Sequence, residues 1–258
     1  MGDPTRAFYD ELAESVHLMF QDWKQSVQWQ AGVLGPLIER ELAAPRLRIL
    51  DCACGIGTQA LGLAMRGHAL MGADLSEAAI SRARREAEQR GLSIEFAAAD
   101  MRDLSGLTDA AFDCAIAVDN ALPHLLDDPH LAQAAQQIAA KLRPGGLLLA
   151  TIRDYDQIVE QRPPAPPPAF FRDGERRRIY HQIWDWTSGR QYTVHLYITL
   201  EIEAGWTCRH FVATYRAVLR AELTAILEQA GFRDVRWLMP ADSGFYQPLV
   251  LARRGGSI

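Results

Sequence analysis

From residue 47 to about residue 152, short apolar runs alternate with segments of helical periodicity. The apolar runs are LRILDCA, HALMGADL, LSIEFAAAD, AFDCAIAVD and GGLLLATIR; the helical segments between them are TQALGLAMRG, SEAAISRARREAEQRG and PHLAQAAQQIAAKLR. Nearly continuous apolar strands are typical of a parallel sheet that is covered on both faces. The pattern therefore predicts an α/β fold, a doubly wound and mostly parallel Rossmann-like sheet.

The pattern changes on both sides of this core. Two helical stretches, at roughly 5–18 and 26–43, precede it. After it, the proline run 163–168 predicts an extended connector, and period-two strands separated by glycine-containing turns follow. A helix and two strands between 220 and 253 return to the sheet. We therefore expect four parts: an N-terminal helical lid at 1–44, a cofactor-binding core at 45–153, an inserted antiparallel β meander over the substrate at 154–216, and the return of the chain to the core sheet at 217–258.

Composition limits the partners of this chain. Its 258 residues carry a net charge of −5, so no overall basic field attracts nucleic acid or an anionic membrane. The first residues lack the apolar segment of a secretory signal, and no run approaches the roughly 18 apolar residues of a membrane span. We expect a cytoplasmic protein that acts on a small molecule and binds neither nucleic acid nor membrane. The oligomeric state stays open.

The four cysteines give a weak metal signal. Cys52 and Cys54 form a C-x-C pair, but Cys114 and Cys208 stand alone in strand-like runs, whereas structural zinc sites usually show a second close pair. Buried thiols that behave as small apolar side chains are the better interpretation, and no metal is expected.

The stretch ILDCACGIGTQA, residues 49–60, joins the first strand to the first helix of the core. Its G-x-G-x-x-A segment fits the pattern of dinucleotide-binding loops, so a nicotinamide cofactor is one interpretation. Asp51 precedes that segment, however, and a carboxylate that repels a pyrophosphate stabilises an ammonium or a sulfonium. Asp74 and Asp100 end the next two strands, and Asp74 is placed to accept both hydroxyls of a ribose. Three acids at successive strand ends favour an adenosine with a cationic tail, which describes S-adenosylmethionine.

Over about residues 45–153 the chain resembles the class I S-adenosylmethionine-dependent methyltransferases. ILDCACGIG is similar to their glycine loop, with Ala53 in place of the usual first glycine, and MGADLS, AADMRD and LRPGGLLL are similar to later motifs. Within that class, DNALPHLLDD, IRDYDQI, YTVHLYITL and FYQPLVLARR resemble the glycine/sarcosine N-methyltransferase group. The resemblance implies a cofactor site at Asp51, Ala53, Gly55, Gly57, Asp74, Leu75, Asp100, Met101, Asp119 and His124, to which Tyr9 and Trp23 of the N-terminal segment are added as lid residues.

The same resemblance implies an acceptor site. Arg153, directly after the fifth strand, would grip a substrate carboxylate, although a surface arginine paired with Asp154 or Asp156 is the alternative. Asn120 would contact the amine. Tyr197 shares a polar strand face with Thr193, His195 and Thr199, which suits a pocket lining. The candidate catalytic residues are Asn120, Arg153, Tyr197 and Tyr215, and Tyr155 and Tyr246 complete the candidate substrate contacts.

These observations favour a methyltransferase that acts on the amine of a compact amino acid such as glycine or sarcosine. Transfer to an oxygen of another small metabolite is the first alternative, with Arg153 serving only structure. A nicotinamide-dependent oxidoreductase and a cofactor-binding module without catalysis are two more. Methylation of a nucleic-acid base is disfavoured, because DNAL at residues 119–122 lacks the D/N-P-P-Y/F signature.

Overall fold

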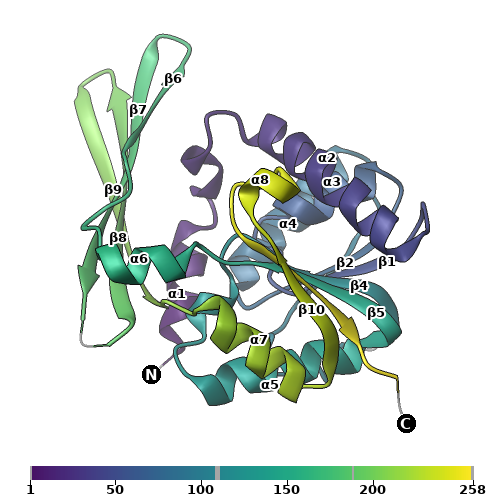
Figure 1. The fold of residues 1–258 in the computed structure, drawn as a ribbon. Helices are drawn as coiled ribbons and strands as arrows, with labels where there is room; N and C mark the ends of the chain where they lie inside the picture. Colours follow the sequence, from purple (N-terminus) through teal and green to yellow (C-terminus); the bar gives the residue numbers. More distant parts are fainter. Residues whose placement is uncertain (1, 108–110, 188, 257–258) are drawn as a thin grey trace.

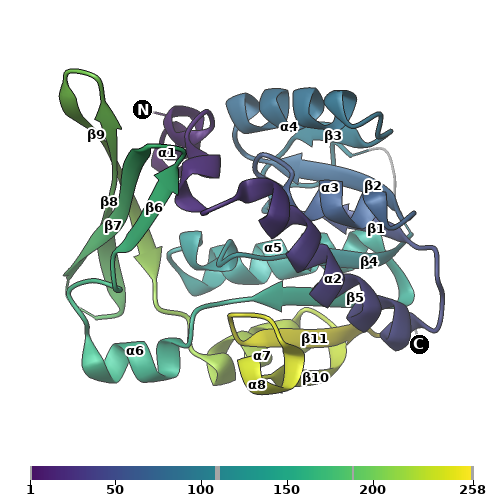
Figure 2. The same cartoon turned by 90° about the horizontal axis from the view of Figure 1, so that it is seen from above.

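The computed structural model describes residues 2–107, 111–187 and 189–256. Figures 1 and 2 show a large sheet with helices on both faces and a smaller sheet that stands to one side of it. Among the described residues, no helix combines the length and the apolar character needed to cross a bilayer.

The large sheet has seven strands in the order β10-β11-β5-β4-β1-β2-β3. Strands β1 to β5 run parallel, and β11 pairs antiparallel with both β5 and β10. The strand order reverses between β1 and β4, which is where doubly wound folds open a ligand crevice. The strands span Arg48–Asp51 (β1), Ala69–Asp74 (β2), Glu95–Ala98 (β3), Phe112–Ala117 (β4), Leu142–Thr151 (β5), Phe232–Leu238 (β10) and Leu249–Arg254 (β11).

Alternating side chains of these strands pack into two cores. Leu147 and Leu149 of β5 face the core under α2, α3 and α4, whereas Leu148 and Ala150 face the core under α5 and α7. The helices begin where the sequence offers caps; for example, the Ser76 hydroxyl accepts the first-turn N–H of α4. The helices span Trp23–Leu42 (α2), Thr58–Met65 (α3), Glu77–Gln89 (α4), Asp128–Lys141 (α5) and Arg220–Gln229 (α7).

The small sheet is an antiparallel meander of four strands in the order β6-β7-β8-β9. Its strands span Ala169–Asp173, Arg176–Trp186, Gln191–Ile202 and Gly205–Arg216. The sequence predicts the three longer strands and the proline connector before them. It does not predict β6, because this short strand follows directly on the prolines, nor the helices α6 (Tyr155–Gln161) and α8 (Pro240–Ser243).

The N-terminal segment lies between the two sheets. It consists of helix α1 (Pro4–Leu12) and the short 3-10 helix η1 (Val16–Met19), and Figure 2 shows it beside β6 to β9 on one side and near α4 on the other. Helix α1 contacts β9 and α4. The expected single helix at 5–18 is thus interrupted after Leu12, and the chain turns toward the meander before α2 begins.

Candidate active site

A cavity of about 860 Å³ opens at the carboxyl ends of β1 to β5, and α1, η1 and the inner face of the meander cover it. Its walls include most of the residues that the sequence singles out. Those on the wall are Tyr9, Ala53, Gly55, Asp74, Leu75, Asp100, Met101, Asp119, Asn120, His124, Arg153, Tyr215 and Tyr246. A volume at the upper end of the range for small-molecule sites gives room for two ligands side by side.

Asp74 fastens the glycine loop to the end of β2. Its Oδ2 accepts the Gly55 N–H at 2.7 Å and its Oδ1 accepts the Ser76 N–H at 2.9 Å. Burial raises the pKa of Asp74, and the two backbone donors oppose that rise. Each carboxylate oxygen keeps a second lone pair, so Asp74 can still accept from a ligand hydroxyl at the cavity wall.

Asp51 lies behind the glycine loop and is not on the cavity wall. One of its oxygens receives a long contact of 3.4 Å from the Ala53 N–H, and Oδ2 has no hydrogen-bond partner among the described residues. Burial raises the pKa of Asp51 to about 8, with the neighbouring Asp74 and Asp119 adding to the rise. The expectation that Asp51 touches the ligand is therefore wrong, because its carboxyl is buried behind the loop and holds a proton at neutral pH.

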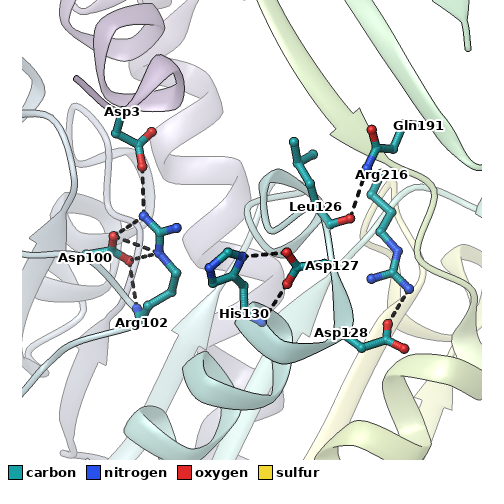
Figure 3. Close-up of polar contacts among 9 residues, drawn as sticks. All are labelled: Asp3, Asp100, Arg102, Leu126, Asp127, Asp128, His130, Gln191 and Arg216. Carbon is teal, nitrogen blue, oxygen red and sulfur yellow. Dashed lines mark hydrogen bonds and ion pairs between the residues drawn. The ribbon is translucent and has the colours of Figure 1, made fainter. Parts of the chain in front are cut away.

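The corner at the end of β3 is held by an ion-pair chain that Figure 3 shows. The carboxylate of Asp100 accepts from Nε of Arg102 at 2.9 and 3.0 Å, and Nη2 of Arg102 reaches Asp3 at 2.8 Å. Asp3 is the N-cap of α1, where it also accepts the Thr5 N–H. These two ion pairs of Arg102 therefore fasten the start of the N-terminal segment to the edge of the cavity.

The end of β4 is a strained turn. Asp119 and Asn120 both have positive φ, 59° and 67°, in the left-handed region that non-glycine residues seldom adopt. The carboxylate of Asp119 accepts from Gln59 at 2.8 Å and from the Tyr246 hydroxyl. Asn120 accepts the Arg153 N–H through Oδ1 at 3.0 Å, while its buried Nδ2 has no partner among the described residues. Nδ2 is therefore a donor left without an acceptor beside the cavity.

Arg153 is the most unusual charge at this site. Its Nη1 donates to the Tyr192 hydroxyl at 2.6 Å, and its guanidinium carbon lies 4.8 Å from the centre of the Trp184 ring and 5.3 Å from that of Tyr215. The acids that follow it are taken by another arginine, because Arg220 pairs with Asp154 and with Asp156 (3.4 Å). Among the described residues, no carboxylate pairs with Arg153.

His124 and Tyr9 join the N-terminal segment to the site. The Tyr9 hydroxyl and Nε2 of His124 are 2.7 Å apart, and the His124 ring lies 4.1 Å from that of Tyr215. Burial lowers the pKa of His124 to about 3, with the charge of Arg153 lowering it further. The imidazole is therefore neutral at physiological pH and is too weakly basic to act as a general base.

Comparison with known proteins agrees with this geometry. Residues 49–146 match the family model described as a methyltransferase domain. This segment is similar to methyltransferase domains. The expected Rossmann-like fold is confirmed, and the match with the family model supports the expected enzyme class and S-adenosylmethionine cofactor.

Relatives of this chain carry several names. A ubiquinone biosynthesis O-methyltransferase of Methylocella silvestris is 39% identical over 117 residues, 44% of each chain. Glycine N-methyltransferase of Mus musculus is 32% identical over 170 residues, 61% of this chain and 57% of its own. The chain thus spans about half the length of these curated relatives. CalS10, an amino pentose methyltransferase of Micromonospora echinaspora, shares the fold with a TM-score of 0.72 at 21% identity, over 89% of this chain and 92% of its own.

Four further residues predicted from the sequence lie off the cavity wall. Tyr197 faces the opposite side of the meander, where it stacks on His181 and His210, so its expected role in the pocket is wrong. Trp23 is buried and donates to the Thr58 hydroxyl at 2.9 Å, so it is not a lid residue. The remaining two are behind the wall: Gly57, with φ 92° at the start of α3, and Tyr155, whose hydroxyl lies 2.8 Å from that of Tyr192.

Sequence reasoning missed some of the meander residues at the site. Leu196 of β8 and Gln182 of β7, which neighbours Trp184 on the same face, line the cavity, and Tyr192 of β8 lies behind that wall, where its hydroxyl accepts from Arg153. The signal was present in the strict alternation of β8, whose apolar positions 192, 194, 196 and 198 mark the covered face. The polar stripe of the other face, which includes Tyr197, is the misleading signal in this strand.

The thiols behave as expected for apolar side chains, except for one. Cys52, Cys54 and Cys114 are buried, and burial raises the pKa of each thiol, whereas Cys208 is exposed on β9. Within the described part of the chain, no three His, Cys, Asp or Glu side chains are grouped so as to hold a metal ion.

Proposed function

We propose that the protein is an S-adenosylmethionine-dependent N-methyltransferase whose acceptor is a small amine that carries a carboxylate. The observation that supports this is the guanidinium of Arg153, which is half-buried, lines the cavity and has no acidic partner among the described residues. A half-buried charge without a counter-charge is only partly compensated, and a ligand carboxylate would complete the compensation through two parallel hydrogen bonds. Glycine and sarcosine are the smallest members of this acceptor class.

In this proposal the cofactor would occupy the core side of the same cavity. Asp74 would bind its ribose, Asp100 and Met101 would hold its adenine, and Asp119 would face its cationic tail; all four residues line the cavity. The bound cofactor would supply a methyl group on a positively charged sulfur, which is a good leaving group. The protein's task is then to hold the acceptor nitrogen in line with that methyl group and to exclude water.

Arg153 also helps to prepare the acceptor. An amine reacts only through its free lone pair, and a fixed positive charge close by lowers the pKa of an ammonium group. The nitrogen lone pair forms the new N–C bond, the C–S bond breaks with its electron pair going to sulfur, and the methylated ammonium then releases one proton. Neutral His124 is not required to act as a base in this scheme.

Transfer to oxygen is the second candidate, favoured by the similarity to the O-methyltransferase of Methylocella silvestris. Methylation of an aliphatic hydroxyl needs a stronger base than methylation of an amine, and the lowered pKa of His124, which lines the cavity, argues against that role for this histidine. The amine is therefore the better-supported acceptor. The acidic net charge supports a small molecule in place of nucleic acid as the partner, and a cytoplasmic location is part of the same proposal.

The test is the variant Arg153→Gln with Arg143→Gln as its matched control. Arg143 pairs with Asp113 at the opposite end of β5, far from the cavity wall. A screen of amine carboxylates, with S-adenosylhomocysteine as the readout, should show that Arg153→Gln lowers kcat/KM by roughly 10²–10³-fold, the loss expected for a charge-assisted pair. Calorimetry should give the same affinity for S-adenosylhomocysteine in both variants. An unchanged acceptor KM, or tight binding of NAD to the wild type, would exclude the proposal.

A further inference from the structure

The cavity is larger than its cofactor and a glycine molecule require together. A cofactor of about 27 non-hydrogen atoms takes roughly 400–550 Å³ at protein packing density. Of the 860 Å³ present, roughly 300–450 Å³ then remain for the acceptor. Glycine, with five non-hydrogen atoms, fills roughly 100 Å³ of that space. The remaining volume suits a molecule several times larger.

The wall around that space is apolar, although it contains several polar side chains. Nε1 of Trp184 donates to Oε1 of Gln182 at 2.7 Å, and the Gln182 amide donates to the Tyr180 hydroxyl. Behind this wall, the hydroxyls of Tyr155 and Tyr192 lie 2.8 Å apart and bond to each other. Because these groups satisfy one another, the aromatic residues on the wall offer their ring faces to a ligand.

The proline connector and the N-terminal segment complete the apolar wall. Pro166 and Pro167 line the cavity and have no N–H to donate. The connector is fixed on the meander, where the Pro164 carbonyl accepts the Trp184 N–H at 2.7 Å. Met19 and Phe20 also line the cavity. A flexible thioether beside rigid rings can adapt to an apolar group of variable shape.

We infer that the natural acceptor is an apolar α-amino acid with a side chain between leucine and tryptophan in size. This inference rests on the proposed N-methylation of an amine carboxylate and narrows it. Arg153 holds the carboxylate and the nitrogen faces the cofactor. The apolar side chain fills the chamber between the Trp184 ring, Leu196 and the proline connector, which we call the acceptor chamber. Glycine binds at Arg153 as well but leaves this chamber empty.

The test compares glycine, alanine, leucine, phenylalanine and tryptophan as acceptors at fixed cofactor concentration. Full burial of a leucine-sized side chain should raise kcat/KM by roughly 10–100-fold over glycine. Glycine and sarcosine turned over at least as well as leucine and phenylalanine would overturn the inference while leaving the proposed function intact. Turnover of none of these amino acids, with S-adenosylhomocysteine still bound, would overturn both.

A pair of variants tests the chamber itself. Ala169 lies on the cavity wall at the start of β6, and Ala169→Trp would fill part of the chamber. Its ratio of kcat/KM for phenylalanine over glycine should fall at least 10-fold. The control is Val212→Trp, on the outer, exposed face of β9, which should leave that ratio unchanged. An equal ratio in both variants, each shown by circular dichroism to be folded, would refute the chamber.

Discussion

The buried carboxyl of Asp51 provides the sharpest prediction, through the variant Asp51→Asn. In the folded protein the pKa of Asp51 is about 8, against 3.8 for an unperturbed side chain. The folded state therefore holds a proton that the unfolded chain releases above about pH 4. Holding it at pH 7 costs ~4 kcal/mol of unfolding free energy. Asparagine resembles the neutral acid in shape, so the variant should be more stable than wild type at pH 7 and should lose this advantage toward pH 4.

The sign follows from the direction of the shift. Because the carboxyl pKa is higher in the folded state, the free energy of unfolding is unaffected below the pKa of the unfolded chain and falls as the pH rises from there toward 8. Urea unfolding of the ligand-free protein at pH 4, 5.5 and 7 measures the difference at each pH, and any constant packing effect of asparagine cancels between pH values. Glu203→Gln, on the exposed turn after β8, serves as control. Parallel stability curves for wild type and Asp51→Asn from pH 4 to 7 would show that Asp51 is ionised when folded.

Two other outcomes are expected. Arg102→Gln removes the ion pairs that link Asp100 to Asp3, so calorimetry should show a 2–10-fold weaker affinity for S-adenosylhomocysteine. Because these pairs are partly exposed, the difference in affinity should shrink at high salt. Equal affinities would mean that the N-terminal segment is held by packing alone. Ellman's reagent should react with about one of the four thiols in the native protein, that of Cys208, and with all four after unfolding. Cys208→Ser should abolish the reaction of the native protein. A second thiol that reacts fast would contradict the burial of Cys52 and Cys54.

The sequence predicts the core sheet well because the strands carry apolar runs and the segments between them have helical periodicity, with a serine cap before α4. The same patterns bring Asp74, Asp100 and Asn120 to one edge, since the carboxyl ends of parallel strands meet there. Contacts between segments far apart in the sequence cannot be predicted from these local patterns. Nothing in the local pattern around Arg153 reveals that Arg220, 67 positions later, takes the two nearby acids and leaves this guanidinium unpaired.

Tyr197 and Asp51 show two different reasons for error. For Tyr197, both faces of β8 carry aromatic residues, and only the packing of the meander against α1 decides which face is covered. For Asp51, the strand end was placed correctly, but the loop after it turns over the carboxylate and hides it from the cavity. Side-chain direction at a strand tip depends on the following turn, which no periodicity encodes.

The position of α1 has a consequence for synthesis on the ribosome. The groups that fasten the N-terminal segment are spread along the chain. Ser76 at the start of α4 and Arg82 within it bind Asp10 and the Ala13 carbonyl, whereas Arg178 and Arg209 of the meander, which is synthesised much later, reach the Leu18 carbonyl and the Ser15 hydroxyl. A nascent chain of about 150 residues would therefore expose an open crevice. Only after β9 emerges can the N-terminal segment be held from both sides, so the cover of the cavity is completed last.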